Sequence, residues 1–414
     1  MKNNAEYQLN FIKKIIDKFG PRLPGSIEET RAAQYIGKEM TKATGKRSII
    51  ERFRCAPLAS VASVPLIGFA LIAIAVPLYL FLPIGAVVVI MLILIFGIFQ
   101  PLLFSGDFDF LFPKRISHNV YNILDPPEKK VDFTLILSGH IDSSWLWNLT
   151  LKHPHRMWGE MLYAVLSVLA LLVVSFLKVL SSYGIITLQG IWIWWILIPI
   201  VPGFFLFMNF LSWDKSVASP GAGDNLSGIS TVLWLAKYFK ENPNKVPKNC
   251  RIIFAGFGSE EAGLKGSFEF VRRHRKDLLK ENVWVINMDG IADSKNFHIM
   301  TGDFFIGTKY DKEYIKLAEK AMKKAKIKFG KARMPVGGTD ASPFSRAGIK
   351  SLSLVAQKVG PIETYHTYND IPENLDPLAL IQTNKVVLNL IEEINKNVHK
   401  KYKPEVIYSP MHSI

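Results

Sequence analysis

The chain has 414 residues, of which 49% are hydrophobic and 12% aromatic, and its formal net charge is +15. It is long enough to bury a large core, and it is too apolar for an ordinary soluble enzyme. The lysines are dispersed, and the richest run (309–331) carries apolar residues at helical spacing. This pattern argues against a nucleic-acid partner and favours attraction to anionic lipid headgroups. Two cysteines, Cys55 and Cys250, are too few for a disulfide framework.

In chain order, two helices are predicted before Pro57, at about 7–19 and 28–41. The turn 20–26 joins them, and its last residue, Ser26, can cap the second helix.

Two apolar blocks interrupt the chain. Residues 55–106 contain no Asp, Glu, Lys, Arg or His, and residues 161–213 contain only Lys178. A membrane span needs about 20 apolar residues, so each block has room for two. We predict helices at about 60–81, 86–104, 161–180 and 191–211, which makes four transmembrane helices in two hairpins. The alternative for the first block is a hairpin buried inside a soluble protein.

Outside these blocks, apolar strands alternate with amphipathic helices. This alternation predicts an α/β fold, with a mixed, mostly parallel sheet and helices on both faces. The predicted strands are 118–124, 131–139, 250–257, 282–288 and 351–355. The predicted helices are 225–240, 264–276, 311–324 and 377–397.

Seven candidate site residues follow apolar strands or lie in loops: His140, Asp142, Asp224, Glu260, Glu261, Asp289 and His366. Ligands bind at the carboxyl ends of strands in open α/β sheets, so these side chains are expected to meet there. A buried group of carboxylates and imidazoles needs positive charge. Its donors suit Zn²⁺, and more loosely Mn²⁺ or Co²⁺. Two histidines and three carboxylates are more ligands than one catalytic zinc with an open position can use. They suit two metals about 3.5–4 Å apart, with one carboxylate that bridges them.

Each residue taken alone has an ordinary structural explanation. A histidine at a strand end can be a packed core residue, and adjacent acids such as Glu260 and Glu261 can form a solvated turn. These explanations do not account for the occurrence of all these residues together at strand ends.

The stretches that hold these residues resemble one known family. They are 138–144, 220–228, 258–267, 287–290, 338–344 and 365–367, with 20–26 near the start of the chain. Together they are similar to the zinc aminopeptidase family that also contains glutamate carboxypeptidase and glutaminyl cyclase. Its members are co-catalytic metallopeptidases with an α/β core. The resemblance covers essentially all of the chain outside the apolar blocks.

The resemblance implies two zinc ions and a shared ligand. Asp224 would bridge both ions. His140 and Asp289 would complete one site, and Glu261 and His366 would complete the other.

The resemblance also implies catalytic roles. Glu260 would be the general base and acid that acts on the metal-activated water, and Asp142 would steer the ring of His140. The expected protein is a membrane-anchored zinc exopeptidase that removes N-terminal residues from peptides. Ala341 stands where many relatives carry a histidine, and a membrane hairpin separates His140 from Asp224 where relatives have a short connection.

The resemblance divides the chain into six parts. They are N-terminal helices (1–56), a transmembrane hairpin (57–106), the first part of the catalytic core (107–158), a second hairpin (159–212), the main catalytic core (213–398) and a tail (399–414). One metal site cannot straddle a bilayer, so both hairpins should leave the soluble segments on one side. The basic residues that flank the hairpins on that side place it in the cytoplasm. They are Lys46, Arg47, Arg52, Arg54, Lys114, Arg115, Lys152, Arg156 and Lys215.

Three alternatives stay open: a single-zinc acyltransferase similar to glutaminyl cyclase, a non-catalytic membrane scaffold of the same fold, and a transporter. The scaffold would lack ligands, and none is missing. The transporter would need polar residues inside its spans. A carboxypeptidase would need a fixed cation for the terminal carboxylate, and Arg346 is the one candidate. The sequence makes no prediction about oligomeric state.

Overall fold

The computed structural model describes residues 2–128, 130–146, 157–187, 217–335, 337–359 and 364–398. Its centre is one eight-stranded sheet with the order β1-β2-β4-β3-β5-β8-β6-β7. The strands are β1 (Ile49–Cys55), β2 (Arg115–Leu124), β3 (Phe133–His140), β4 (Cys250–Phe257), β5 (Val283–Ile291), β6 (Phe297–Asp303), β7 (Phe329–Met334) and β8 (Lys350–Ala356). The pairs β3–β4, β3–β5, β5–β8 and β6–β7 are parallel, and β1–β2, β2–β4 and β6–β8 are antiparallel. The mixed, mostly parallel sheet predicted from the sequence is confirmed.

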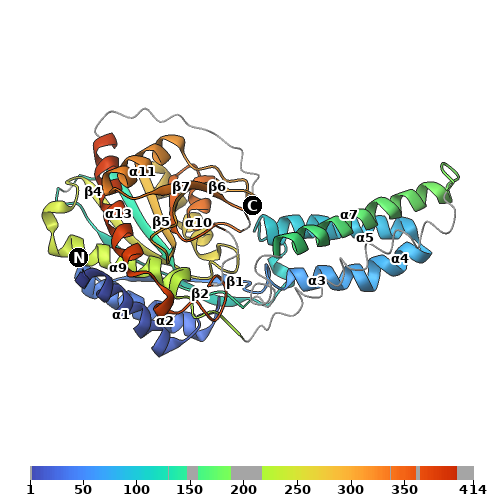
Figure 1. Ribbon diagram of the computed structural model, residues 1–414, viewed down its shortest axis with the longest axis horizontal. Helices are drawn as coiled ribbons and strands as arrows, with labels where there is room; N and C mark the ends of the chain where they lie inside the picture. Colours follow the sequence, from blue (N-terminus) through green and yellow to red (C-terminus); the bar gives the residue numbers. More distant parts are fainter. Residues whose placement is uncertain are drawn as a thin grey trace.

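Helices cover both faces of this sheet (Figure 1). The helices of the α/β body are α1 (Lys2–Phe19), α2 (Ile27–Thr44), α9 (Ser227–Glu241), α10 (Lys265–Lys280), α11 (Lys312–Ala325), α12 (Ala341–Arg346) and α13 (Pro377–Val398). Short helical turns lie at Asp109–Leu111, Ala222–Leu226, Pro243–Lys245 and Pro372–Asn374.

Strand β3 shows how the sequence divides the core between the two faces. Successive side chains of a strand point to opposite sides. Leu135 and Leu137 belong to the large cluster packed by α1, α2, α9, α11 and α13, while Ile136 belongs to the cluster packed by α10 and α12. All eight residues of β3 are buried, as expected for an inner strand that is apolar on both faces.

Most predicted elements are present with shifted ends. Ser26 caps α2 by accepting a hydrogen bond from the amide of Glu29 at 3.0 Å. The predicted amphipathic helix in the lysine-rich run is α11, and its apolar positions, including Tyr314 and Met322, are buried. The final helix begins at Pro377 as predicted.

Three strands were not predicted: β1, β6 and β7. Strand β1 follows the two predicted N-terminal helices and lies at one edge of the sheet, with Glu51, Arg52 and Arg54 in its sequence. Strand β7 lies at the other edge and has no fully buried residue. Edge strands carry charge to discourage further pairing, so they lack the apolar run that reveals an inner strand.

An apolar arm projects from the α/β body (Figure 1). It consists of α3 (Ser63–Ala70), α4 (Val76–Phe81), α5 (Pro83–Gly97) and α7 (Met157–Ser182), with π-helical turns at Leu71–Ala75 and Ile98–Leu102. Three stretches are long and apolar enough to cross a membrane by length and composition: Ser63–Phe81, Pro83–Leu102 and Leu162–Ser182. The predicted fourth helix, at 191–211, lies outside the described residues.

The arm has its own apolar core and a largely apolar outer surface. Leu71, Ala86, Ile90 and Leu171 are among the side chains packed between its helices. Lys178, its one charged residue in the spans, donates to the carbonyl oxygens of Tyr79 at 2.8 Å and Leu80 at 3.0 Å. These carbonyls end α4, where a cation complements the helix dipole.

Helix α9 packs closely against the sheet because residue 228 is a glycine and has no side chain. A Cβ atom there would overlap the carbonyl oxygen of Met288 in β5. We expect Gly228→Ala to lower the free energy of unfolding by about 1–3 kcal/mol, because the helix must move away from the sheet. Thermal unfolding in detergent measures this. Gly159→Ala in α7 is the control, since nothing lies within 4 Å of a Cβ at that position. Equal losses in the two variants would contradict the prediction.

Candidate metal centre

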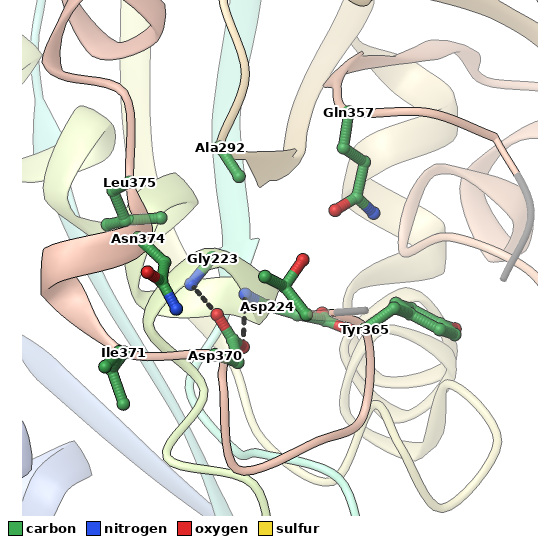
Figure 2. A pocket seen from close by; sticks show the side chains of 10 residues that line it. Gly223, Asp224, Ala292, Gln357, Tyr365, Asp370, Ile371, Asn374 and Leu375 are labelled. Carbon is green, nitrogen blue, oxygen red and sulfur yellow. Dashed lines mark hydrogen bonds between the residues drawn. The ribbon is translucent and has the colours of Figure 1, made fainter. Parts of the chain in front are cut away.

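Asp224 lies in the loop that connects Gly221 to helix α9. Gly221 has a φ of +68°, in the left-handed region that glycine adopts without strain. The carboxylate of Asp370 accepts hydrogen bonds from the backbone amides of Gly223 at 2.6 Å and Asp224 at 3.1 Å, as Figure 2 shows. The side-chain oxygen of Asn225 accepts a hydrogen bond from the backbone amide of Gly228 at 3.0 Å. These bonds fix the direction in which the Asp224 side chain leaves the loop.

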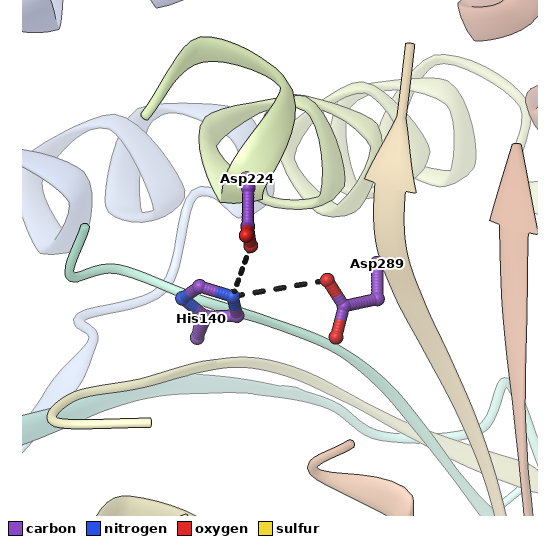
Figure 3. Close-up of side chains that lie close together, drawn as sticks. All are labelled: His140, Asp224 and Asp289. Carbon is purple, nitrogen blue, oxygen red and sulfur yellow. Dashed lines mark hydrogen bonds and ion pairs between the residues drawn. The ribbon is translucent and has the colours of Figure 1, made fainter. Parts of the chain in front are cut away.

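One oxygen of the Asp224 carboxylate faces His140 and Asp289 (Figure 3). His140 Nε2 lies 3.0 Å from Asp224 Oδ1 and 3.8 Å from Asp289 Oδ1. His140 is the last residue of β3, and Asp289 lies inside β5, which runs past the predicted strand end to Ile291. The three side chains form a group whose ligand atoms lie within 4.8 Å of one another.

The other oxygen of Asp224 faces His366 and Glu261. His366 Nε2 lies 3.2 Å from Asp224 Oδ2 and 3.2 Å from Glu261 Oε1. These three residues form a second group of the same kind, and Asp224 belongs to both. His366, in a loop with a φ of +54°, is thereby brought to the carboxyl ends of the strands.

Asp142 and Glu260 complete the set of predicted residues. The carboxylate of Asp142 accepts hydrogen bonds from the backbone amides of Glu260 and Glu261, both at 3.0 Å. Its Oδ1 also lies 3.6 Å from His140 Nδ1, on the side of the ring away from Asp224. Glu260 Oε2 lies 3.9 Å from His140 Nε2. The structure therefore brings all seven predicted residues to one place at the sheet edge.

Burial makes this group electrostatically costly. It raises the pKa of Glu260 well above the ordinary value and raises the pKa of Glu261 and Asp289, and repulsion between the carboxylates adds to the effect. Burial would also raise the pKa of Asp224, but its contacts with the two histidines hold that pKa well below its usual range.

For the two histidines, burial and the neighbouring charges have opposite effects on the pKa, and the charges prevail. Burial alone would lower the pKa of His366, yet the charges of Glu261 and Asp224 raise it to about 10. Burial opposes the charged form of His140 as well, and the charge of Glu260 raises its pKa well above 6.5. The site thus stabilises any positive charge placed among its carboxylates.

The donor set fits zinc. Imidazole nitrogens and carboxylate oxygens are its ordinary ligands in proteins. Among the described residues, His366 Nε2 and Glu261 Oε1 are buried without a hydrogen-bond partner of acceptable geometry, although they are 3.2 Å apart. Both atoms are of the kind that binds zinc, so a cation between them would give each a partner.

Three buried residues that support the site were not assigned roles from the sequence: Arg22, Glu29 and Asp370. The guanidinium of Arg22 donates to the carbonyl oxygens of Ile141 at 2.8 Å, Pro220 at 2.9 Å and Gly221 at 3.1 Å. It therefore ties the segment after His140 to the Asp224 loop across the second apolar block. For two of them the sequence held a clue in their position. Arg22 lies in the stretch 20–26 that resembles the family, and Asp370 lies in the loop of His366.

Glu29 supports the loop of Glu260 from the other side. Its Oε1 accepts hydrogen bonds from the amide of Ser259 at 2.7 Å and from the hydroxyl of Ser117 at 2.9 Å. Burial, with the nearby charge of Asp142, raises the pKa of Glu29 to about 8.

Two charged residues, Asp340 and Arg346, lie in or next to the Gly338–Phe344 stretch. Asp340 is buried, its oxygens have no hydrogen-bond partner of acceptable geometry in the described part of the chain, and burial raises its pKa to about 7. Arg346, the one candidate cation for a terminal carboxylate, ends α12 and stacks over the ring of Phe268 at 5.6 Å.

The fold and the donor set together define a zinc-exopeptidase-like α/β protein. Residues 212–391 match the model of Peptidase family M28, so the chain contains a Peptidase M28 domain. The family resemblance predicted from the sequence is confirmed at this level.

One curated relative matches part of the chain. Aminopeptidase YwaD of Bacillus subtilis (strain 168) is 30% identical over 205 residues, which are 48% of this chain and 42% of that protein. The chain thus spans less than half of that relative's length.

Two solved aminopeptidases, one from Aneurinibacillus sp. strain AM-1 and a zinc enzyme from Bacillus subtilis, each superpose with a TM-score of 0.55 at 16% identity. The matches cover 94% of this chain and 93% and 95% of theirs. A Zn-dependent exopeptidase from Parabacteroides distasonis gives 0.53 at 12% identity, covering 94% of this chain and 97% of its own. At these identities the likeness shows a common fold.

The contact of Asp370 with the Asp224 loop predicts an effect on metal affinity. We expect Asp370→Asn to weaken zinc binding about 10- to 100-fold, because an amide group cannot accept both backbone N–H bonds and Asp224 loses its orientation. Competition with a chelator measures this. Asp376→Asn is the matched control, since Asp376 also accepts two backbone amides, from Ser294 and Leu378. Unchanged zinc affinity in Asp370→Asn would contradict the prediction.

Proposed function

We propose that the protein is a membrane-anchored, zinc-dependent aminopeptidase with a two-metal centre. The observation that carries the proposal is the position of Asp224, whose two carboxylate oxygens face two different histidines at 3.0 and 3.2 Å. One zinc would be held by His140, Asp224 and Asp289, and the other by Asp224, Glu261 and His366. The name of the Bacillus relative supports the aminopeptidase assignment.

Zinc bound there supplies Lewis acidity toward the scissile carbonyl and lowers the pKa of water. The side chains of His140, Glu260 and Glu261 form a third group of the same kind, so Glu260 lies beside a ligand of each proposed zinc. Because neither proposed zinc uses Glu260 as a ligand, Glu260 is the general base. It accepts the proton of the attacking water at its carboxylate and returns that proton to the leaving amine. The raised pKa that burial gives Glu260 suits a group that must both take up and release a proton.

Recognition of the free N-terminus follows from the charge of the site. Asp289, Glu260 and Glu261 surround the reacting position with negative charge, and an ammonium group is its natural partner. A carboxypeptidase would need a cation there, and Arg346 is instead engaged with Phe268.

Membrane anchoring rests on the apolar arm. Its spans are largely unburied within the protein, since only 22% to 33% of each apolar stretch is buried. Apolar side chains that are exposed along whole helices are stable in lipid, and their exposure to water raises the free energy of the protein. The basic residues beside the hairpins support a cytoplasmic position of the catalytic domain.

The neighbours Glu260 and Glu261 should respond differently to the same substitution. We expect Glu260→Gln to lower kcat about 10²- to 10⁴-fold with zinc retained, because only the proton acceptor is lost. Glu261→Gln should lose zinc, because the amide replaces a charged ligand. Hydrolysis of an aminoacyl reporter and zinc content by mass spectrometry measure both effects. Near-normal turnover by zinc-loaded Glu260→Gln would overturn the assignment of the base.

The requirement for a free amine is tested with matched peptides. We expect release of single amino acids from a peptide with a free N-terminus and none from its acetylated form, because acetylation removes the ammonium charge. Mass spectrometry of the products measures this, and removal of zinc with a chelator is the control that must abolish it. Cleavage of the acetylated peptide would defeat the aminopeptidase assignment. Pyroglutamate as the product would favour the cyclase-like alternative.

The orientation of the arm is tested with introduced cysteines. Gly85 lies in the first turn of α5, at the far end of the first hairpin, and Asn4 lies in α1 of the α/β body. In intact cells, a cysteine at Gly85 should react with a membrane-impermeant thiol reagent, and one at Asn4 should not. The native Cys55 and Cys250 are buried. The reverse labelling pattern would put the active site outside the cell.

A further inference from the structure

The loop Ser259–Lys265, which carries Glu260 and Glu261, lies against both ends of the first apolar hairpin. The loop is tightly wound, with left-handed φ values at Ser259 (+53°), Gly263 (+97°) and Leu264 (+59°). The amides of Gly263 and Leu264 both bond to the carbonyl oxygen of Glu260, at 2.8 and 2.7 Å. The amide of Lys265 also bonds to the carbonyl oxygen of Ser259 at 3.1 Å, so these hydrogen bonds connect both ends of the loop to the backbone around Glu260.

The entry end of the hairpin contacts the loop through Ser60. Its hydroxyl donates to the carbonyl oxygen of Ala262 at 3.0 Å, and both residues are buried. Ser63, the first residue of α3, in turn donates to the carbonyl oxygen of Ser60. The start of the first apolar helix is therefore linked by two buried hydrogen bonds to the residue after Glu261.

The exit end contacts the same loop through Phe104 and Asp109. A Cβ atom on Gly263 would lie 3.0 Å from the Phe104 ring, so the ring packs directly on the loop backbone. Asp109 Oδ2 pairs with Lys265 Nζ at 2.8 Å, and both side chains are largely buried. Asp109 Oδ1 accepts from Gln100, a buried residue in the last turn of the second apolar helix, also at 2.8 Å.

The α/β body holds the opposite side of the loop. Asp142 accepts the amides of Glu260 and Glu261, and Glu29 accepts the amide of Ser259. The loop is therefore clamped between the body and the hairpin, with polar, buried contacts on both sides. A simple tether would need none of the contacts on the hairpin side.

We infer that Ser60, Phe104, Asp109 and Lys265 are positioning residues through which the ends of the apolar hairpin hold Glu260 and Glu261 in place. The arm is thus part of the support of the active site as well as its anchor. This rests on the proposed function for the roles of the two glutamates. The contacts themselves involve neither metal ligation nor substrate.

The test compares two lysines of the arm contacts. Lys265→Met removes the ion pair at the root of the hairpin, and Lys178→Met removes the lysine that caps α4 at the far end. We expect Lys265→Met and Ser60→Ala to lower kcat about 10- to 100-fold with KM nearly unchanged, because misplacement of a catalytic group acts on the chemical step. Lys178→Met should leave kcat within about twofold of wild type, and Lys265→Arg, which keeps the charge, should restore most of the loss.

A second readout is independent of activity. Hydrogen exchange of the segment 259–265, followed by mass spectrometry on the full-length protein, should be at least about tenfold faster in Lys265→Met and Ser60→Ala than in wild type and Lys178→Met. Exchange that is unchanged in those two variants would overturn the inference. Values of kcat within about twofold of wild type in Lys265→Met and Ser60→Ala would also overturn it. A wild-type protein without aminopeptidase activity would refute the proposed function, while the exchange comparison would still decide whether the hairpin holds the loop.

Discussion

The structure of the site depends on one constraint, the gathering of buried carboxylates around Asp224. Charges removed from water must be compensated, and here the two histidines are the nearest partners on either side of the Asp224 carboxylate. Elements from distant parts of the chain supply the surrounding nitrogen and oxygen atoms. His140 ends β3, Asp289 lies in β5, and Glu260 and Glu261 follow β4. The parallel pairing of these strands brings their carboxyl ends to one edge, so the sheet creates the electrostatic cost and positions the ligands that a cation would need.

A layer of buried hydrogen bonds holds these side chains in register. Asp142 and Asp370 each use both carboxylate oxygens to hold two backbone amides, one pair at the glutamate loop and the other at the Asp224 loop. Arg22 bonds to backbone carbonyls from both sides of the second apolar block. Because this block separates His140 from Asp224 in the sequence, the two halves of the site are joined by contacts of this kind, together with backbone hydrogen bonds such as that from Ser219 to Ser144. The apolar arm acts on the same layer through the root of its first hairpin.

The sequence predicted the fold class, and it singled out seven side chains that the structure places close together, because both depend on local patterns. An inner strand is a short apolar run, and a ligand that directly follows it is placed by the strand itself. The edge strands β1 and β7 escaped notice because they carry charge and are half exposed. The supporting residues escaped for a different reason. Whether Asp370 or Glu29 holds a particular amide depends on which loops meet in three dimensions, and nothing in the residues around them encodes that partner. The packing of Phe104 on Gly263 is of the same kind, since it joins two loops far apart in the chain.

We propose that Asp224 is shared between two metals, and diffraction at the zinc absorption edge would locate both of them. Crystals of the zinc-loaded protein, measured above and below the edge, should show two anomalous peaks on opposite sides of the Asp224 carboxylate. One should lie among His140, Asp224 and Asp289, and the other among Asp224, Glu261 and His366. A single peak, or peaks away from Asp224, would contradict the account.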